Sequence, residues 1–88
     1  MLTYAYVPDM AERRQPHRAA HLSNLEAARD RGFLTLAGAF TDPVDGAVLL
    51  FEADDPGQVL HWVSTDPYCH AGLIRSATVR EISVAVRR

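Results

Sequence analysis

The sequence contains no lysine, and all nine of its basic residues are arginine. The absence of lysine excludes a Schiff-base lysine, a phosphate-loop lysine and a lysine general base. Any bound anion would therefore be held by arginine, whose planar guanidinium group suits carboxylates and other planar oxyanions. A genome composition that replaces lysine with arginine accounts for the same bias. The bias therefore excludes lysine chemistry but does not identify a bound anion.

Cysteine and long apolar runs are scarce as well. The single cysteine, Cys69, excludes an internal disulfide and a metal site built from cysteines alone. The longest uninterrupted aliphatic or aromatic run, Ala47 to Phe51, is far too short to span a bilayer. Nothing near Met1 resembles a signal peptide. We therefore expect a cytoplasmic protein that has no membrane partner.

The remaining composition is that of a folded globular protein. Hydrophobic residues make up 48% and charged residues 23% of the 88 residues, and a chain of this length forms one domain. A net charge of −2 argues against a nucleic-acid partner. The sequence lacks the glycine-rich fingerprints of nucleotide-binding proteins and the Gly-x-Ser-x-Gly motif of serine hydrolases. We expect a single domain over residues 1–88 with no cofactor.

Strand and helix signals alternate in the order β-α-β-β-α-β. The predicted strands are Leu2–Val7, Phe33–Phe40, Ala47–Ala53 and Thr78–Val86. The predicted helices lie between Met10 and Arg31 and between Asp55 and Asp66. Phe33–Phe40 is apolar on both alternations, so we expect that strand to be buried on both faces. In the last predicted strand, apolar residues alternate with polar ones.

Capping residues mark the ends of the helices. Pro16 indicates either a short turn before a helix that starts there or a kink within a longer helix. Gly32 is a natural C-terminal cap for that helix. Asp55, Pro56 and Gln58 fit an N-cap, a first helical position and a capping box.

This order of elements is the ferredoxin-like, α+β arrangement. It predicts a four-stranded antiparallel sheet with both helices on one face. The opposite face then has no cover from the chain itself, and a small monomer rarely exposes such a patch. We therefore expect a homodimer that is built sheet to sheet.

His21 is the histidine that the helical spacing places beside the apolar stripe. It falls close to Leu25 and Ala28 at 100° per residue, and Arg18 lies near the same direction. A half-buried histidine needs a partner for a ring nitrogen. That partner is either a backbone carbonyl, which makes His21 structural, or a carboxylate, which makes it a general base.

Asp66 is the carboxylate that fits this second role. It precedes Pro67, so it can cap a short turn that runs from Pro67 to Gly72. The same side chain can accept a hydrogen bond from one nitrogen of His21, fix the tautomer and leave the other nitrogen free for proton transfer. Both elements are expected on the helical side of the sheet, so the separation in sequence is no obstacle.

Two alternatives use other polar side chains. His17 and His21 are four residues apart, so both can face one metal ion, with His70, Cys69 or Asp66 as a third ligand. Cys69 and His70 are also adjacent, which makes a thiolate–imidazole pair conceivable. The metal site lacks the glutamate of a His-Glu-x-x-His motif, and neighbouring residues on a turn usually point apart. The favoured interpretation therefore contains no metal.

The chain resembles the YCII-related family of small ferredoxin-like proteins. The resemblance covers nearly the whole chain in order. It is carried by Arg18-Ala19-Ala20-His21-Leu22, Gly32-Phe33-Leu34, Leu36-Ala37-Gly38, Gly46 and Asp66-Pro67-Tyr68 with Ala71-Gly72. It implies the ferredoxin-like fold, dimers of the α/β-barrel type and an active site centred on a histidine and an aspartate.

The resemblance also implies roles for individual residues. It makes His21 and Asp66 the catalytic pair and gives Arg18 and Arg14 to substrate binding. Two further residues are expected to line the pocket, Tyr68 of the Asp-Pro-Tyr motif and Gly38 of the Ala-Gly-Pro segment. This chain reads Ala-Gly-Ala at that segment, so the pocket wall near Ala39 departs from the family pattern.

Similar proteins include lyase-like enzymes that eliminate halide from hydroxylated aromatic rings, and the wider superfamily includes lactone isomerases and monooxygenases without metal. The first hypothesis is therefore a cofactor-independent enzyme that eliminates or isomerises a small anionic or hydroxylated substrate. Three residues would share the work: His21 moves the proton, Asp66 orients the imidazole and Arg18 holds the anion. The alternatives are a small-ligand-binding or accessory domain without catalysis and a purely structural dimerisation module.

Overall fold

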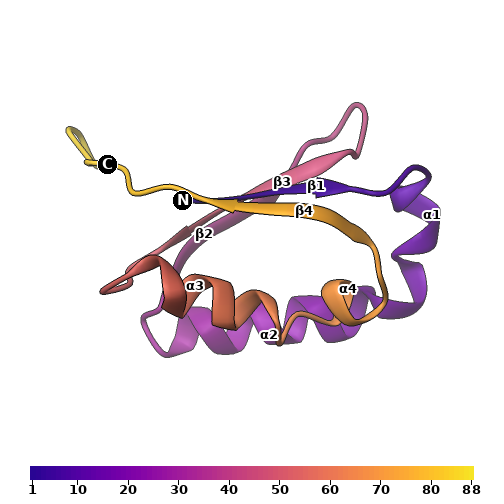
Figure 1. Cartoon of the computed structure of the whole chain (residues 1–88), viewed down its shortest axis with the longest axis horizontal. Coiled ribbons are helices and arrows are strands. Elements are labelled where there is room, and N and C mark those ends of the chain that lie inside the picture. The colour runs from indigo at the N-terminus through magenta and orange to yellow at the C-terminus, as the bar shows by residue number, and fades with distance from the viewer.

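The computed structural model describes all of residues 1–88 and contains one four-stranded sheet with its helices on one side (Figure 1). The elements are β1 (Leu2–Tyr6), α1 (Met10–Arg13), the 3-10 turn η1 (Gln15–His17), α2 (Arg18–Asp30), β2 (Leu34–Ala39), β3 (Gly46–Phe51), α3 (Pro56–Val63), α4 (Pro67–His70) and β4 (Ile74–Val79). The strand order is β2-β3-β1-β4, and every neighbouring pair is antiparallel. The fold is the ferredoxin-like α+β arrangement.

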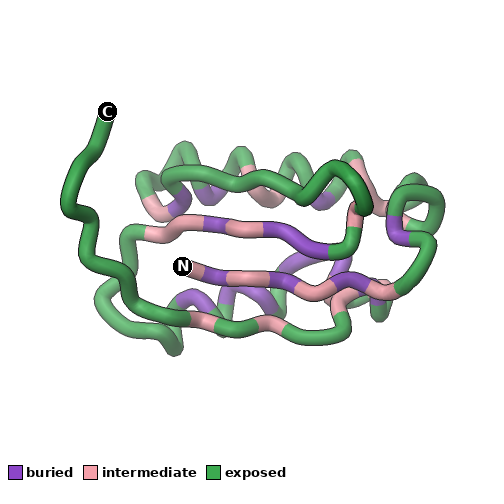
Figure 2. The backbone as a smooth tube through the Cα atoms, turned by 90° about the horizontal axis from the view of Figure 1, so that it is seen from above, coloured by how far each residue is buried: buried purple, intermediate pink, exposed green.

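The core lies between the sheet and the helices. Alternate residues of β1, namely Leu2, Tyr4 and Tyr6, are buried because they face the helical layer. Trp62 of α3 and Leu49 of β3 close the same layer. Seen from above, the buried positions concentrate in the central strands β1 and β3 (Figure 2). The central strands therefore form the part of the sheet against which the helices and the candidate site residues pack.

The opposite face of the sheet carries no helix (Figure 1). The strand register places nine residues on that face, all of them uncharged: Thr3, Ala5, Leu36, Gly38, Gly46, Val48, Leu50, Ser76 and Thr78. We call this face of the sheet the outer face, and the side chains at these nine positions are small or apolar.

The expectation that Phe33–Phe40 is buried on both faces is wrong. In β2 only Leu34 is buried, and the rest of the strand is exposed. The reason is topological, because β2 is an edge strand with β3 as its only neighbour. An apolar strand at the edge of a sheet has the same sequence pattern as a strand at its centre.

The expectation that Thr78–Val86 forms the last strand is also wrong. β4 begins earlier, at Ile74, and ends at Val79. The last ladder pair of β4 is Val79 with Leu2, and the amide of Arg80 bonds the carbonyl of Met1 just beyond it. Residues 80–88 therefore run beyond the sheet as an exposed segment, and Val86 is 90% exposed (Figure 2).

The helix boundaries follow the capping residues. Of the two possibilities at Pro16, the structure has the short turn, with α1 and η1 preceding α2. Gly32 adopts a φ of 75°, and the amides of Gly32 and Phe33 bond the carbonyls of Arg29 and Ala28, which is the Schellman pattern. At the start of α3, Asp55 accepts from the amide of Gln58 at 3.1 Å. None of the helices has both the length and the apolar character needed to cross a membrane.

Candidate functional site

Asp66 is the buried side chain with the most hydrogen-bond partners. It is the N-cap of α4 and is completely buried, with 0% exposure. Its Oδ1 accepts from the backbone amide of Tyr68 at 3.0 Å and lies 2.7 Å from Nδ1 of His21. Its Oδ2 accepts from the hydroxyl of Tyr4 at 2.9 Å. Both oxygens of this buried carboxylate therefore have hydrogen-bond partners in place of solvent.

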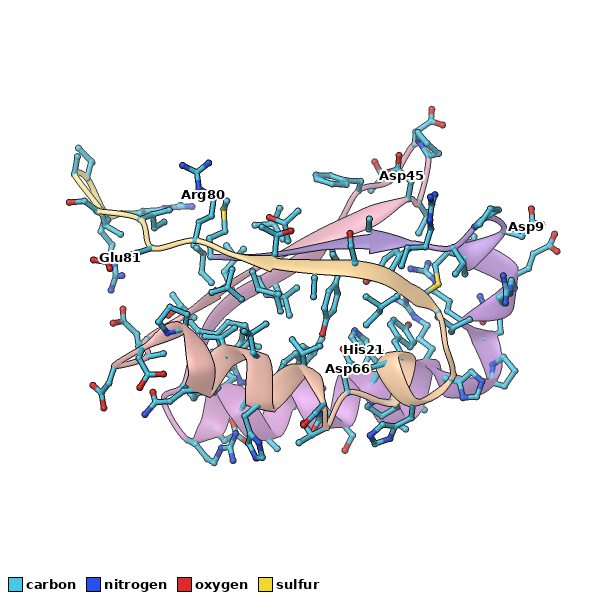
Figure 3. The ribbon with its side chains drawn as sticks, in the orientation of Figure 1. Asp9, His21, Asp45, Asp66, Arg80 and Glu81 are labelled. Atoms are coloured by element: carbon cyan, nitrogen blue, oxygen red, sulfur yellow. The ribbon has the colours of Figure 1, made fainter.

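His21 reaches this carboxylate from α2, on the face that packs against the sheet. The residue is 7% exposed, and Figure 3 shows it beside Asp66 in the space between the helices and the sheet. Because an ionised carboxylate only accepts hydrogen bonds, Nδ1 of His21 carries the proton in the neutral ring. Its other nitrogen, Nε2, has no hydrogen-bond partner in the chain. The free lone pair of the ring is therefore on Nε2.

Tyr68 fixes the plane of this imidazole. The two rings are stacked, with centroids 3.7 Å apart and an angle of 7° between their planes. Tyr68 also donates its amide to Asp66, so one residue orients both members of the pair. The Pro67–His70 turn thus positions the aspartate and the ring that covers the histidine together.

His21 and Tyr68 line a cavity of about 170 Å³ between α2 and the strands β2 and β3. Two arginines, Arg14 and Arg18, line it as well, and neither forms an ion pair within the protein. Nε of Arg14 and the hydroxyl of Tyr68 are buried without a hydrogen-bond partner. Unsatisfied buried donors are rare in native proteins. The cavity is therefore lined by two guanidinium groups that form no ion pair within the chain.

The tyrosines around the pair remain protonated. Burial raises the pKa of Tyr4, and the charge of Asp66 raises it further. Burial likewise raises the pKa of Tyr6 and Tyr68, while the nearby guanidinium groups of Arg14 and Arg18 oppose this change. The phenols therefore act as hydrogen-bond donors over the neutral range of pH.

The structure brings five of the six expected site residues to one cavity wall. The lining residues are Arg14, Arg18, His21, Gly38 and Tyr68. The sixth, Asp66, lies behind His21 and is closed off from the cavity. Arg14 takes part although the helix is interrupted after it, because α1 and η1 keep it on the same side of the molecule.

The two alternative arrangements of polar side chains do not form. No three side chains among the histidines, the cysteine and the acidic residues are grouped so that they could hold a metal ion. Nε2 of His70 lies 2.6 Å from the carbonyl oxygen of Ser64, so that ring is tied to the backbone. Cys69 is a free, half-buried thiol.

Three larger hollows lie elsewhere on the surface, and the smallest of them, of about 220 Å³, lies between α2 and β2. Another of about 320 Å³ lies under residues 79–87, and one of about 730 Å³ lies in the groove between α2 and α3. None of the three includes His21, Arg14 or Arg18. The smallest cavity remains the candidate site, because it alone combines an imidazole with a free nitrogen and two unpaired cations.

Sequence reasoning did not assign Tyr4 or Tyr6 to the site. Tyr4 bonds Asp66 from behind, and Tyr6 lines the cavity with its ring 6.1 Å from that of Tyr68. The available signal was the alternation of β1, which puts Leu2, Tyr4 and Tyr6 on the helical side. A tyrosine on that side also needs a partner for its hydroxyl.

A sequence model described as the YCII-related domain matches residues 1–83. Among solved structures, the chain is similar to the 5-chloro-2-hydroxyhydroquinone dehydrochlorinase of Burkholderia phenoliruptrix, determined in complex with 2,5-dihydroxybenzoquinone. The TM-score is 0.77 at 24% sequence identity, and the match covers 94% of each chain. Among curated proteins, none matches this chain. The structural likeness shows a shared fold.

Proposed function

The chain belongs to the YCII-related domain family, and from this membership and the geometry of the cavity we propose that it is a small-molecule acid–base enzyme. In this proposal His21 moves the proton and Asp66 orients the imidazole. The observation that carries the proposal is that only one of the two ring nitrogens of His21 has a hydrogen-bond partner within the chain. Nδ1 is held by a buried carboxylate at 2.7 Å, whereas Nε2 has no partner in the chain.

The proposed chemistry follows from this difference between Nδ1 and Nε2. Nε2 takes a proton from a carbon or hydroxyl of the substrate, and Asp66 stabilises the imidazolium that results. A leaving group then departs in an elimination, or the proton returns at another atom in an isomerisation. Arg18 and Arg14 stabilise the negative charge that develops on substrate oxygen, which is most effective in a site with little water. Neither outcome requires a hydride donor.

The substrate class that this site favours is a small anion with hydroxyl or enolate oxygens, including hydroxylated aromatic rings. Two unpaired guanidinium groups favour planar oxyanions. The structurally similar dehydrochlorinase acts on a hydroxyhydroquinone and holds a dihydroxybenzoquinone, which is consistent with this class.

The test measures binding and turnover separately. Binding uses 2,5-dihydroxybenzoquinone, followed by its absorbance, and turnover uses 5-chloro-2-hydroxyhydroquinone, followed by chloride release. We expect R18A to weaken binding about tenfold or more, since a charge-assisted bond contributes roughly 1.5–3 kcal/mol. We expect H21A to keep binding within a few-fold and to lose turnover by about 100-fold or more.

The control is R29A, which removes an exposed arginine of α2 that lies outside the cavity. It should change neither quantity. Full turnover by H21A would exclude the acid–base role. Binding by the wild type without turnover of any hydroxylated aromatic substrate would favour a ligand-binding domain without catalysis.

We also propose that a second copy of the chain covers the outer face. The support is the absence of charge at its nine register positions together with the exposure of Leu36, at 52%. An uncharged face with small side chains allows two sheets to approach closely. The candidate site residues on the helices, namely Arg14, Arg18, His21, Asp66 and Tyr68, lie on the other side of the sheet, so this association leaves the cavity on the helical side of each copy.

A further inference from the structure

We propose that Tyr4 is a positioning residue of the site, and that its buried hydroxyl keeps the Asp66 carboxylate in the orientation and ionised state that His21 needs. The inference deepens the proposed function and rests on it for the catalytic consequence. Tyr4 does not line the cavity, so it touches no substrate. Any influence that it has on the reaction passes through Asp66.

The first argument is the count of donors around Asp66. Its Oδ1 has two partners, the imidazole of His21 and the amide of Tyr68. Its Oδ2 has one partner only, the hydroxyl of Tyr4 at 2.9 Å. Because Asp66 is 0% exposed, water does not reach Oδ2 as a substitute. Tyr4 is therefore the sole source of hydrogen bonding to half of the carboxylate.

The second argument concerns charge. An ionised oxygen that is buried without a donor is costly, and protonation of the carboxyl relieves that cost. A protonated Asp66 could no longer stabilise an imidazolium, and its neutral oxygens would not force the proton of His21 onto Nδ1. Tyr4 itself stays a donor, because burial and the neighbouring carboxylate both raise its pKa.

The third argument is rigidity. Tyr4 lies in the middle of β1, paired with Ala47 on one side and Ala77 on the other. Its hydroxyl is therefore held by a central strand, while Asp66 and His21 come from α4 and α2. The bond ties the short α4 turn to the sheet, and it fixes the carboxylate relative to the strands that floor the cavity. A side chain on an edge strand would give a looser reference point.

The experiment compares Y4F with wild type, using Y6F as the matched control. Both substitutions remove one buried strand hydroxyl, but the hydroxyl of Tyr6 makes no hydrogen bond to Asp66. The primary measurement is the pair of ring 15N chemical shifts of His21 at neutral pH, which report the tautomer. D66N gives the reference for a ring without its carboxylate.

We expect wild type and Y6F to show the tautomer with the proton on Nδ1. We expect Y4F to move toward the D66N pattern, with a share of the other tautomer. In the chloride-release assay Y4F should lose turnover about tenfold or more, since small misplacements of a catalytic group have effects of this size. Its affinity for 2,5-dihydroxybenzoquinone should stay within a few-fold of wild type.

His21 shifts in Y4F that are identical to wild type would overturn the proposal, because a merely structural Tyr4 changes stability and leaves the tautomer alone. If Y4F does not fold, Y68F with and without 3-fluorotyrosine is compared, so that the ring stacked on His21 carries no fluorine while the more acidic phenol of Tyr4 donates more strongly. Only the Tyr4 hydroxyl bonds Asp66, so the Nδ1 proton resonance of His21 should move upfield, and an unmoved resonance counts against the proposal. The tautomer measurement needs no turnover, so failure of the enzyme proposal and failure of this one are distinguishable.

Discussion

The Asp66 carboxylate receives donors from three elements, and each donor has a different task. The amide of Tyr68 makes it the cap of α4, the imidazole of His21 makes it half of a candidate acid–base pair, and the hydroxyl of Tyr4 completes its coordination. One side chain thus serves a local turn and a long-range site together. The predicted cap is therefore confirmed, and it does not exclude the catalytic role of Asp66, which stays a prediction.

The buried tyrosines give a prediction for alkaline pH. Burial raises the pKa of Tyr4 and Tyr6 in the folded chain, whereas an unfolded chain releases the same protons near pH ~10. Below that pH both states hold the protons and stability is unaffected. Above it the unfolded state loses protons that the folded state keeps, so the free energy of unfolding falls with rising pH.

The measurement is a series of urea titrations between pH ~9 and ~11.5, in the range around the ordinary tyrosine pKa. Each of the two tyrosines should contribute a loss of about 1.4 kcal/mol per pH unit above pH ~10. No lysine titrates in this range to obscure the effect. Y6F should show a shallower decline than wild type. A free energy of unfolding that stays constant across the range would contradict the prediction.

At the scale of elements, the close pairing of β1 with β3 depends on Gly46. A Cβ at position 46 would collide with the backbone carbonyl of Tyr4 and would meet the ring of Phe40 at 3.2 Å. We expect G46A to reduce the free energy of unfolding by about 2 kcal/mol, as overpacking of a closed site does. Thermal or urea unfolding measures the change.

The matched control for G46A is G38A, in the neighbouring strand. A Cβ at Gly38 meets nothing within 4 Å, so the free energy of unfolding should stay the same or rise by up to about 1 kcal/mol. Equal losses in the two variants would show that a general glycine effect, and not the contact with Tyr4, governs this pairing.

The elements divide into those that local signals determine and those that depend on pairing. The caps at Gly32, Asp55 and Asp66 follow from side chains and conformations that act within a few residues, and the sequence predicts all three. The extent of β4 does not follow in this way, because it depends on the pairing with β1, whose last ladder pair is Leu2 with Val79. The exposure of β2 likewise depends on its place in the strand order.

At the scale of the whole molecule, the proposed pairing of two outer faces predicts the oligomeric state. Wild type should sediment at twice the 9.7 kDa mass of the chain. V48D places a charge in the middle of this face, which burial against a second copy would not tolerate, so it should sediment as a monomer. S23D adds the same charge on an exposed position of α2 and should leave the dimer intact. A monomeric wild type would refute the pairing.

The site as a whole could be predicted from the sequence only in part. The helical spacing put His21 on the inward side of α2, and the resemblance to the family singled out Asp66. The contribution of Tyr4 was out of reach, since it depends on the distance between the centre of the sheet and the α4 turn. Contacts of that kind join residues 62 positions apart along the chain, and no local pattern records them.

The bond network around Asp66 also couples ligand binding to folding. Its partners come from β1, α2 and α4, so a partial opening that detaches any one of these segments dismantles the pair. A ligand that binds only the assembled cavity must then stabilise the entire chain by mass action. Amide hydrogen exchange should slow on binding even in β4, whose own residues lie outside the cavity. The effect of a ligand on exchange far from the cavity would therefore measure how cooperatively the domain unfolds.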